Sequence, residues 1–104
     1  MSSTQKEPLD CRMLGELWEV ICNRAAHPDV KSYTSRLLND PKGIDKVLEK
    51  VGEESTEFIL AVKNGVPRRT AEEAADLFFH LFVALRAADV DLKEVIAELE
   101  RRRK

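Results

Sequence analysis

A chain of 104 residues has room for one domain, and we expect that domain to span residues 1–104 with a flexible end at residues 1–9. The formal net charge of -2 excludes the general basic character of a nucleic-acid-binding protein. No apolar run approaches the roughly 20 residues that cross a bilayer, so we expect no membrane partner. Cys11 and Cys22 have the spacing of neither a metal site nor a redox motif, and they indicate reduced thiols in a cytoplasmic protein.

Two regions with different patterns make up the first part of the chain. Apolar residues at helical spacing predict a helix from about Asp10 to Ala26. The helix is expected to end before Pro28, because the residue that precedes a proline is disfavoured in helical conformation. Residues 29–43 are mixed and rich in turn formers, and they carry no clear period.

Three further helices are predicted in the second part. One has an apolar stripe from Ile44 to Val62 and is stopped by Asn64 and Gly65, a typical C-terminal cap pair. The next runs from about Pro67 to Ala88, and the last covers an apolar stripe between residues 92 and 99. Short joints between long amphipathic helices predict an all-α bundle of four to five helices.

The positions of four acids are the most informative feature of the sequence. Glu54 and Glu57 are three residues apart on one predicted helix, and Glu73 and Asp76 are three apart on the next. Gly65 lies midway between Glu57 and Glu73, and also midway between Glu54 and Asp76. If the two helices fold back antiparallel about Gly65, all four carboxylates converge at one level of the bundle.

Converging carboxylates predict a cation site, because like charges repel and are unfavourable when buried without partners. Ligands that are all oxygen select a hard ion, Mg²⁺ or also Mn²⁺. Simpler readings exist for individual residues. Glu73 could cap its helix in a T-x-x-E capping box with Thr70, and Glu53, Glu54 and Glu57 could form a solvated face paired with Lys50.

The helix that carries the second acid pair is apolar nearly all round. From Ala74 to Ala88 only Asp76, His80 and Arg86 interrupt the apolar residues. A helix of this kind is normally buried, here by the bundle and by a second subunit, so we expect a homodimer. His80 is expected to be a core histidine with satisfied hydrogen bonds rather than a metal ligand.

These residues carry a resemblance to a known family. The E-E-x-x-E pattern at residues 53–57, followed by E-x-x-D at 73–76, resembles the all-α nucleoside triphosphate pyrophosphatases. Three more stretches make the resemblance narrower: S-Y-T at 32–34, G-I-D-K at 43–46 and K-N-G at 63–65. Together, over about residues 14–101, they look like phosphoribosyl-ATP pyrophosphatase of histidine biosynthesis.

The resemblance implies Mg²⁺-dependent hydrolysis of phosphoribosyl-ATP to phosphoribosyl-AMP and pyrophosphate, by attack of water on the α–β phosphoanhydride. The family is often fused to a zinc-dependent cyclohydrolase, and since the chain has no cysteine and histidine set for one, the resemblance implies the single-function form. It also implies roles by position. The metal ligands would be Glu54, Glu57, Glu73 and Asp76; the proton acceptor would be Glu53 or Glu57; the substrate would be held by Lys46, Lys50, Ser32, Tyr33 and Thr34.

Two other functions remain open from the sequence. A house-cleaning pyrophosphatase of the same superfamily would share the fold and the acids but act on ordinary or damaged dNTPs, and Tyr33, Thr34 and Lys46 argue against it. A non-catalytic helical dimerisation module would carry the same acids as a merely solvated face.

Overall fold

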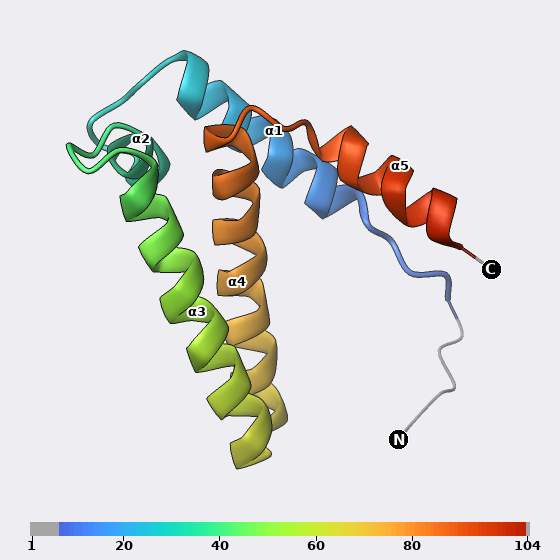
Figure 1. The fold of residues 1–104 in the computed structure, drawn as a ribbon. Coiled ribbons are helices and arrows are strands. Elements are labelled where there is room, and N and C mark those ends of the chain that lie inside the picture. The colour runs from blue at the N-terminus through green and yellow to red at the C-terminus, as the bar shows by residue number, and fades with distance from the viewer. Residues whose placement is uncertain (1–6, 104) are drawn as a thin grey trace.

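The computed structural model describes residues 7–103, and within that range it is helical with no β-strand (Figure 1). The predicted all-α class is therefore confirmed. The region 29–43 contributes a short helix of its own. Residues 7–103 therefore contain five helices, the larger of the two numbers expected. The flexible end predicted at residues 1–9 lies mostly outside the described residues. The helices are α1 (Arg12–Ala26), α2 (Tyr33–Leu38), α3 (Ile44–Asn64), α4 (Pro67–Ala87) and α5 (Leu92–Arg102).

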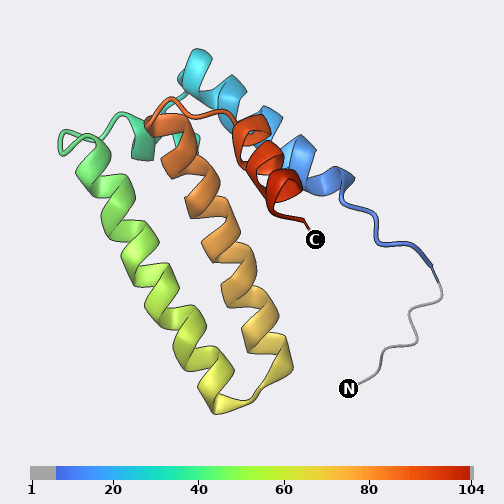
Figure 2. The ribbon, with the colours of Figure 1, turned by 45° about the vertical axis from the view of Figure 1, so that its right-hand side comes forward.

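An antiparallel hairpin of α3 and α4 forms the main body of the molecule, and these helices make the most extensive contact of any pair (Figures 1 and 2). Gly65 ends α3 in the left-handed region, with φ of 72°, which favours glycine because it has no Cβ. Its N–H donates back to the carbonyls of Ala61 and Val62. Pro67 then occupies the first turn of α4, where a missing N–H does no harm.

The start of α4 decides between two readings of Glu73. The N-cap of α4 is Val66, so Thr70 already lies inside the helix, where its own N–H donates to the Val66 carbonyl. The reading of Glu73 as half of a capping box with Thr70 is therefore wrong. Glu73 instead points into the contact between α3 and α4, and only 4% of its surface is exposed.

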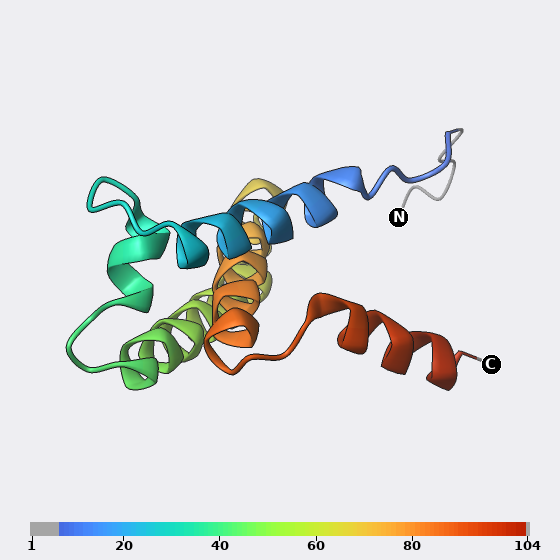
Figure 3. The same ribbon diagram turned by 90° about the horizontal axis from the view of Figure 1, so that it is seen from above.

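A small core closes the end of the hairpin that is remote from Gly65. It takes one apolar residue from each of four helices: Ile21 of α1, Leu37 of α2, Val47 of α3 and Val83 of α4. Helix α1 crosses α4 there, and α2 covers the end of α3 (Figure 3). The four acids thus lie between this core and the turn.

Helix α5 begins with a capping box at Asp91 and Glu94, yet it buries none of its residues. Within residues 7–103 it packs extensively on none of the other helices. It extends from the core end of the hairpin on the same side as the start of α1 (Figure 3). The predicted stripe is therefore uncovered in the single chain: Leu99 is 63% exposed and Ile96 is 48% exposed. No helix in the described range has the length and apolar character to cross a membrane.

Candidate metal and nucleotide site

Three carboxylates meet where α3 and α4 face each other midway along the hairpin. Glu54 and Glu57 come from α3 and Glu73 from α4, and one oxygen of each lies within 4.8 Å of the others. Glu54 and Glu73 are buried, whereas Glu57 is exposed at the edge of the group. We call these three residues the carboxylate cluster. The fold about Gly65 that the sequence predicts is what brings them together.

Two oxygens of the carboxylate cluster lack a hydrogen-bond donor. Glu54 Oε2 and Glu73 Oε1 are buried and have no partner among residues 7–103. A buried carboxylate oxygen without a donor is unfavourable, so the site is short of positive charge. Carboxylate oxygens are the ligands that Mg²⁺ and Mn²⁺ prefer, and these residues therefore fit a hard divalent cation.

The pKa of Glu73 also reflects the lack of positive charge around its carboxylate. Burial raises it above the ordinary glutamate value of 4.5, and the negative charge of Glu57 raises it further. Arg69 opposes both effects, because its Nη2 lies 3.3 Å from Glu73 Oε2. Asp76 adds a smaller raising effect. Burial and the neighbouring negative charge thus favour binding of a positive charge to the carboxylate cluster, either a proton or a metal cation.

Two basic side chains border the carboxylate cluster. Lys50 Nζ lies 3.2 Å from Glu53 Oε1 and 3.7 Å from Glu54 Oε1. The pKa of Lys50 is raised, first by the hydrogen bond with Glu53, while Tyr33 and Glu54 nearby contribute in the same direction. Arg69 borders the other side, where its Nη1 also lies 2.6 Å from Glu72 Oε1. Both cations face the anionic site with exposed surface left for a phosphate.

Arg69 is the residue of this site that the sequence analysis missed. It lines a cavity of about 310 Å³ that also contains Glu57 and runs toward the hairpin turn. The available signal was its spacing of four residues before Glu73, which puts both on one face of α4. The remaining lining residues of this cavity are Leu60, Ala61, Asn64 and Val66.

The structure does not bring Asp76 and Glu53 into the carboxylate cluster. Asp76 is exposed, and it is near enough to raise the pKa of Glu73 without joining the three oxygens. Glu53 is exposed and paired with Lys50. Counting residues from Gly65 gives the level of an acid along the helix but not its rotation about the helix axis. Glu73 is rotated inward and Asp76 outward.

The residues expected to hold the substrate differ in their exposure and in whether their polar groups already have hydrogen-bond partners. The Ser32 hydroxyl accepts from the Ser35 N–H at 3.2 Å and so caps α2, while Thr34 is buried. Tyr33 is half-exposed, and its hydroxyl lies 3.1 Å from Nε2 of His80. Lys46 is partly exposed one turn before Lys50. Of the three residues 32–34, Tyr33 therefore offers the most accessible surface.

His80 has the structural setting that the sequence predicts. It is 6% exposed, and Nδ1 lies 2.8 Å from the backbone carbonyl of Asp76. Both ring nitrogens have partners, so the expectation of a satisfied core histidine is confirmed.

Comparison with known proteins gives one consistent result. A family model described as phosphoribosyl-ATP pyrophosphohydrolase matches residues 14–103. The phosphoribosyl-ATP pyrophosphatase of Methanoregula boonei is 77% identical over 104 residues, which are 100% of each chain. That of Methanosphaerula palustris is 62% identical over 95 residues, 91% of this chain and 96% of the relative. A histidine biosynthesis bifunctional protein of Gloeobacter violaceus is 47% identical over 91 residues, 88% of this chain but 40% of its own length.

Proposed function

The chain belongs to the phosphoribosyl-ATP pyrophosphohydrolase family, and on that premise we propose that it hydrolyses phosphoribosyl-ATP to phosphoribosyl-AMP and pyrophosphate in histidine biosynthesis. The bond that breaks is the α–β phosphoanhydride. The observation that carries the proposal is the carboxylate cluster, which places two buried and unsatisfied oxygens beside two basic side chains. We take residues 1–104 as the one domain that performs this reaction.

We propose that the carboxylate cluster holds Mg²⁺, with Mn²⁺ as a substitute. Glu54, Glu57 and Glu73 would be ligands, and Asp76 would join them from the exposed edge. When bound, such a cation supplies positive charge against the phosphate oxygens and favours deprotonation of an attacking water. The support for this assignment is the pair of oxygens on Glu54 and Glu73 that have no donor among the described residues.

The basic residues of the chain would bind and orient the triphosphate. Lys50 and Lys46 lie one turn apart on α3, and Arg69 lies on the opposite side of the carboxylate cluster. Each of them offers N–H donors to phosphate oxygens, and Arg69 can offer two in one plane. A triphosphate held from both sides would lie across the carboxylate cluster.

The proton of the attacking water would go to a carboxylate of the chain. Glu53 and Glu57 are the two candidates, because both are exposed. Glu53 is already ion-paired with Lys50, whereas Glu57 lies at the exposed edge of the carboxylate cluster beside the buried Glu73. We therefore favour Glu57 as the general base, acting through the carboxylate oxygen that would not face the cation, and the α–β anhydride bond breaks as the bond from the water oxygen to phosphorus forms.

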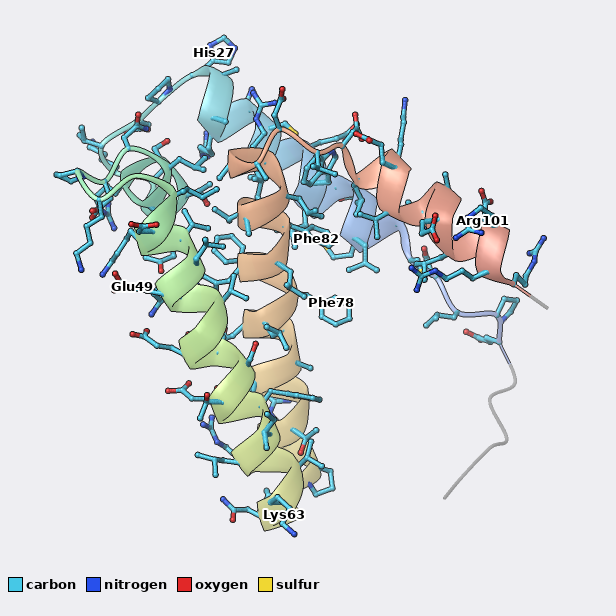
Figure 4. The ribbon with its side chains drawn as sticks, viewed as in Figure 1. His27, Glu49, Lys63, Phe78, Phe82 and Arg101 are labelled. Atoms are coloured by element: carbon cyan, nitrogen blue, oxygen red, sulfur yellow. The ribbon has the colours of Figure 1, made fainter. Side chains whose placement is uncertain are left out.

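We also propose a homodimer in which a second copy covers the face of α4 that points away from α3. Phe78 projects from that face and is 46% exposed (Figure 4). An apolar hollow of about 280 Å³ lies beside Phe78 between α1 and α4. Uncovered apolar surface of this kind marks an interface, and a small core gains stability from it. The uncovered stripe of α5 would add to the same contact.

A cytoplasmic location is part of the proposal, and the state of the cysteines supports it. Cys11 and Cys22 are both free thiols, as is usual in a reducing compartment. The rival dimerisation module does not account for buried acids, since a merely solvated face would leave Glu54 and Glu73 exposed.

The decisive experiment measures pyrophosphate release from phosphoribosyl-ATP, with Mg²⁺ and with EDTA, beside a panel of ordinary nucleotides. We expect strong release from phosphoribosyl-ATP in Mg²⁺ alone. Release from dCTP and other dNTPs in preference to phosphoribosyl-ATP would place the protein with the house-cleaning enzymes. The absence of release from every nucleotide would favour the dimerisation module.

A further inference from the structure

The His80 ring bridges two helices that are distant in sequence. Its Nδ1 lies 2.8 Å from the backbone carbonyl of Asp76, one turn earlier on α4. Its Nε2 lies 3.1 Å from the hydroxyl of Tyr33 on α2, 47 residues away in the chain. The imidazole itself is buried.

These two contacts determine where the hydrogen atoms lie. The Asp76 carbonyl can only accept a hydrogen bond, so Nδ1 of His80 must carry the hydrogen. In the neutral imidazole Nε2 is then an acceptor, and the Tyr33 hydroxyl must donate to it. The only hydrogen of that hydroxyl is therefore used, and its lone pairs remain.

Tyr33 is held at the border of the nucleotide site in this orientation. Its ring stands at 79° to the His80 ring with centroids 5.9 Å apart, and it packs on Phe79 at 6.0 Å. The side chain stays half-exposed, on the side of the molecule where Lys50 pairs with Glu54. The side chain that carries this acceptor is thus partly open to solvent near Lys50.

We propose that His80 is a positioning residue of the nucleotide site, which makes the Tyr33 hydroxyl a fixed acceptor for an N–H or O–H donor of the nucleotide. The inference rests on the proposed function for the identity of that nucleotide. A ribose hydroxyl or an amino group fits this acceptor, whereas a phosphate oxygen does not, because the hydroxyl has no hydrogen left to donate.

The first test needs no activity, because it measures the tautomer of His80 directly. The chain has two histidines, so two-bond ¹H–¹⁵N correlation spectra of the labelled protein at about pH 8, where an ordinary histidine is neutral, give two assignable rings. We expect His80 to carry its hydrogen on Nδ1, and exposed His27 serves as the internal reference. A hydrogen on Nε2 of His80 would overturn the proposal.

The second test asks whether His80 acts through Tyr33. We expect Tyr33→Phe and His80→Phe each to raise KM for phosphoribosyl-ATP about 3- to 10-fold, the usual contribution of one hydrogen bond, with the loss in KM rather than in kcat. The double variant should be no worse than either single one. His80→Gln retains an acceptor near Nε2, so it should recover most of the lost affinity, and His27→Phe is the matched control.

Several outcomes would overturn the positioning role. Additive effects of the two phenylalanine substitutions, or a His80→Gln variant as weak as His80→Phe, would show that His80 does not act through the hydroxyl. A lower melting temperature with unchanged KM would show that the contact only joins α2 to α4. If the wild-type protein releases no pyrophosphate, the proposed function fails, while the tautomer measurement still decides the hydrogen-bond pattern.

Discussion

Glu54 on α3 and Glu73 on α4 bring carboxylate oxygens to within 4.8 Å of each other across the hairpin, and each has one buried oxygen without a donor among residues 7–103. Two like charges held this way oppose folding unless a cation joins them. Lys50 and Arg69 offset part of the repulsion from opposite sides. The remaining repulsion between these two carboxylates is what a bound cation would remove at the proposed active site.

Removing Glu54 should abolish the reaction. We expect Glu54→Gln to lower kcat for phosphoribosyl-ATP at least about 100-fold, since even residues that only support metal ligands contribute up to that amount. Glu49→Gln is the matched control: Glu49 is an exposed acid of the same helix, paired with Lys42 and directed away from α4 (Figure 4). Near-normal turnover in the Glu54 variant would refute the proposed metal site.

Mg²⁺ should stabilise the fold because it binds the native carboxylate cluster and not the unfolded chain. At a hundredfold excess over its dissociation constant we expect a rise in melting temperature on the order of 10 °C. Differential scanning calorimetry with matched ionic strength of NaCl checks this, and Glu54→Gln should show little of the rise. Equal shifts from Mg²⁺ and from NaCl would indicate general screening instead of a site.

Glu73→Gln should stabilise the metal-free protein near neutral pH. The pKa of Glu73 is raised in the folded state, so the folded protein binds more protons there than the unfolded one, and stability falls as pH rises from 4.5 through the raised value. Above the raised pKa, the charge on Glu73 lowers the stability by its full amount. Below pH 4.5 it has no effect, because Glu73 is then protonated in both states. Burial is the largest cause of the raised pKa, Glu57 and Asp76 raise it further, and Arg69 opposes them.

Urea unfolding in EDTA at several pH values measures this effect. The advantage of Glu73→Gln over the wild type should be largest near neutral pH and vanish toward pH 4.5. Glu72→Gln is the control of opposite sign, because hydrogen bonds from Arg69 and Arg68 lower the pKa of Glu72 and its removal should be neutral or slightly destabilising. A Glu73→Gln advantage independent of pH would assign the effect to packing.

The exposed face of α4 predicts the oligomeric state. Phe78→Glu places a charge in the proposed interface, so we expect it to shift the protein from dimer to monomer at micromolar concentration. Light scattering coupled to size exclusion checks this, with Val30→Glu as control, since Val30 is 83% exposed in the loop before α2. A wild-type protein that is already monomeric would refute the dimer.

The sequence by itself determined the helices, the turn and the level of the acids along the hairpin. Apolar periodicity places α1, α3, α4 and α5, and Gly65 marks the reversal, because these signals depend on neighbours along the chain. Each residue rises about 1.5 Å along a helix, so counting from Gly65 is enough to predict that Glu57 and Glu73 meet.

Only the tertiary structure decided how those helices are rotated and what covers them. It turns Glu73 inward and Asp76 outward, brings Arg69 beside the carboxylate cluster, and leaves α5 without extensive contact to another helix in the described range. It also joins Tyr33 to His80 across 47 residues. Such contacts depend on the crossing of helices that are distant in sequence, and local spacing carries no information about that angle.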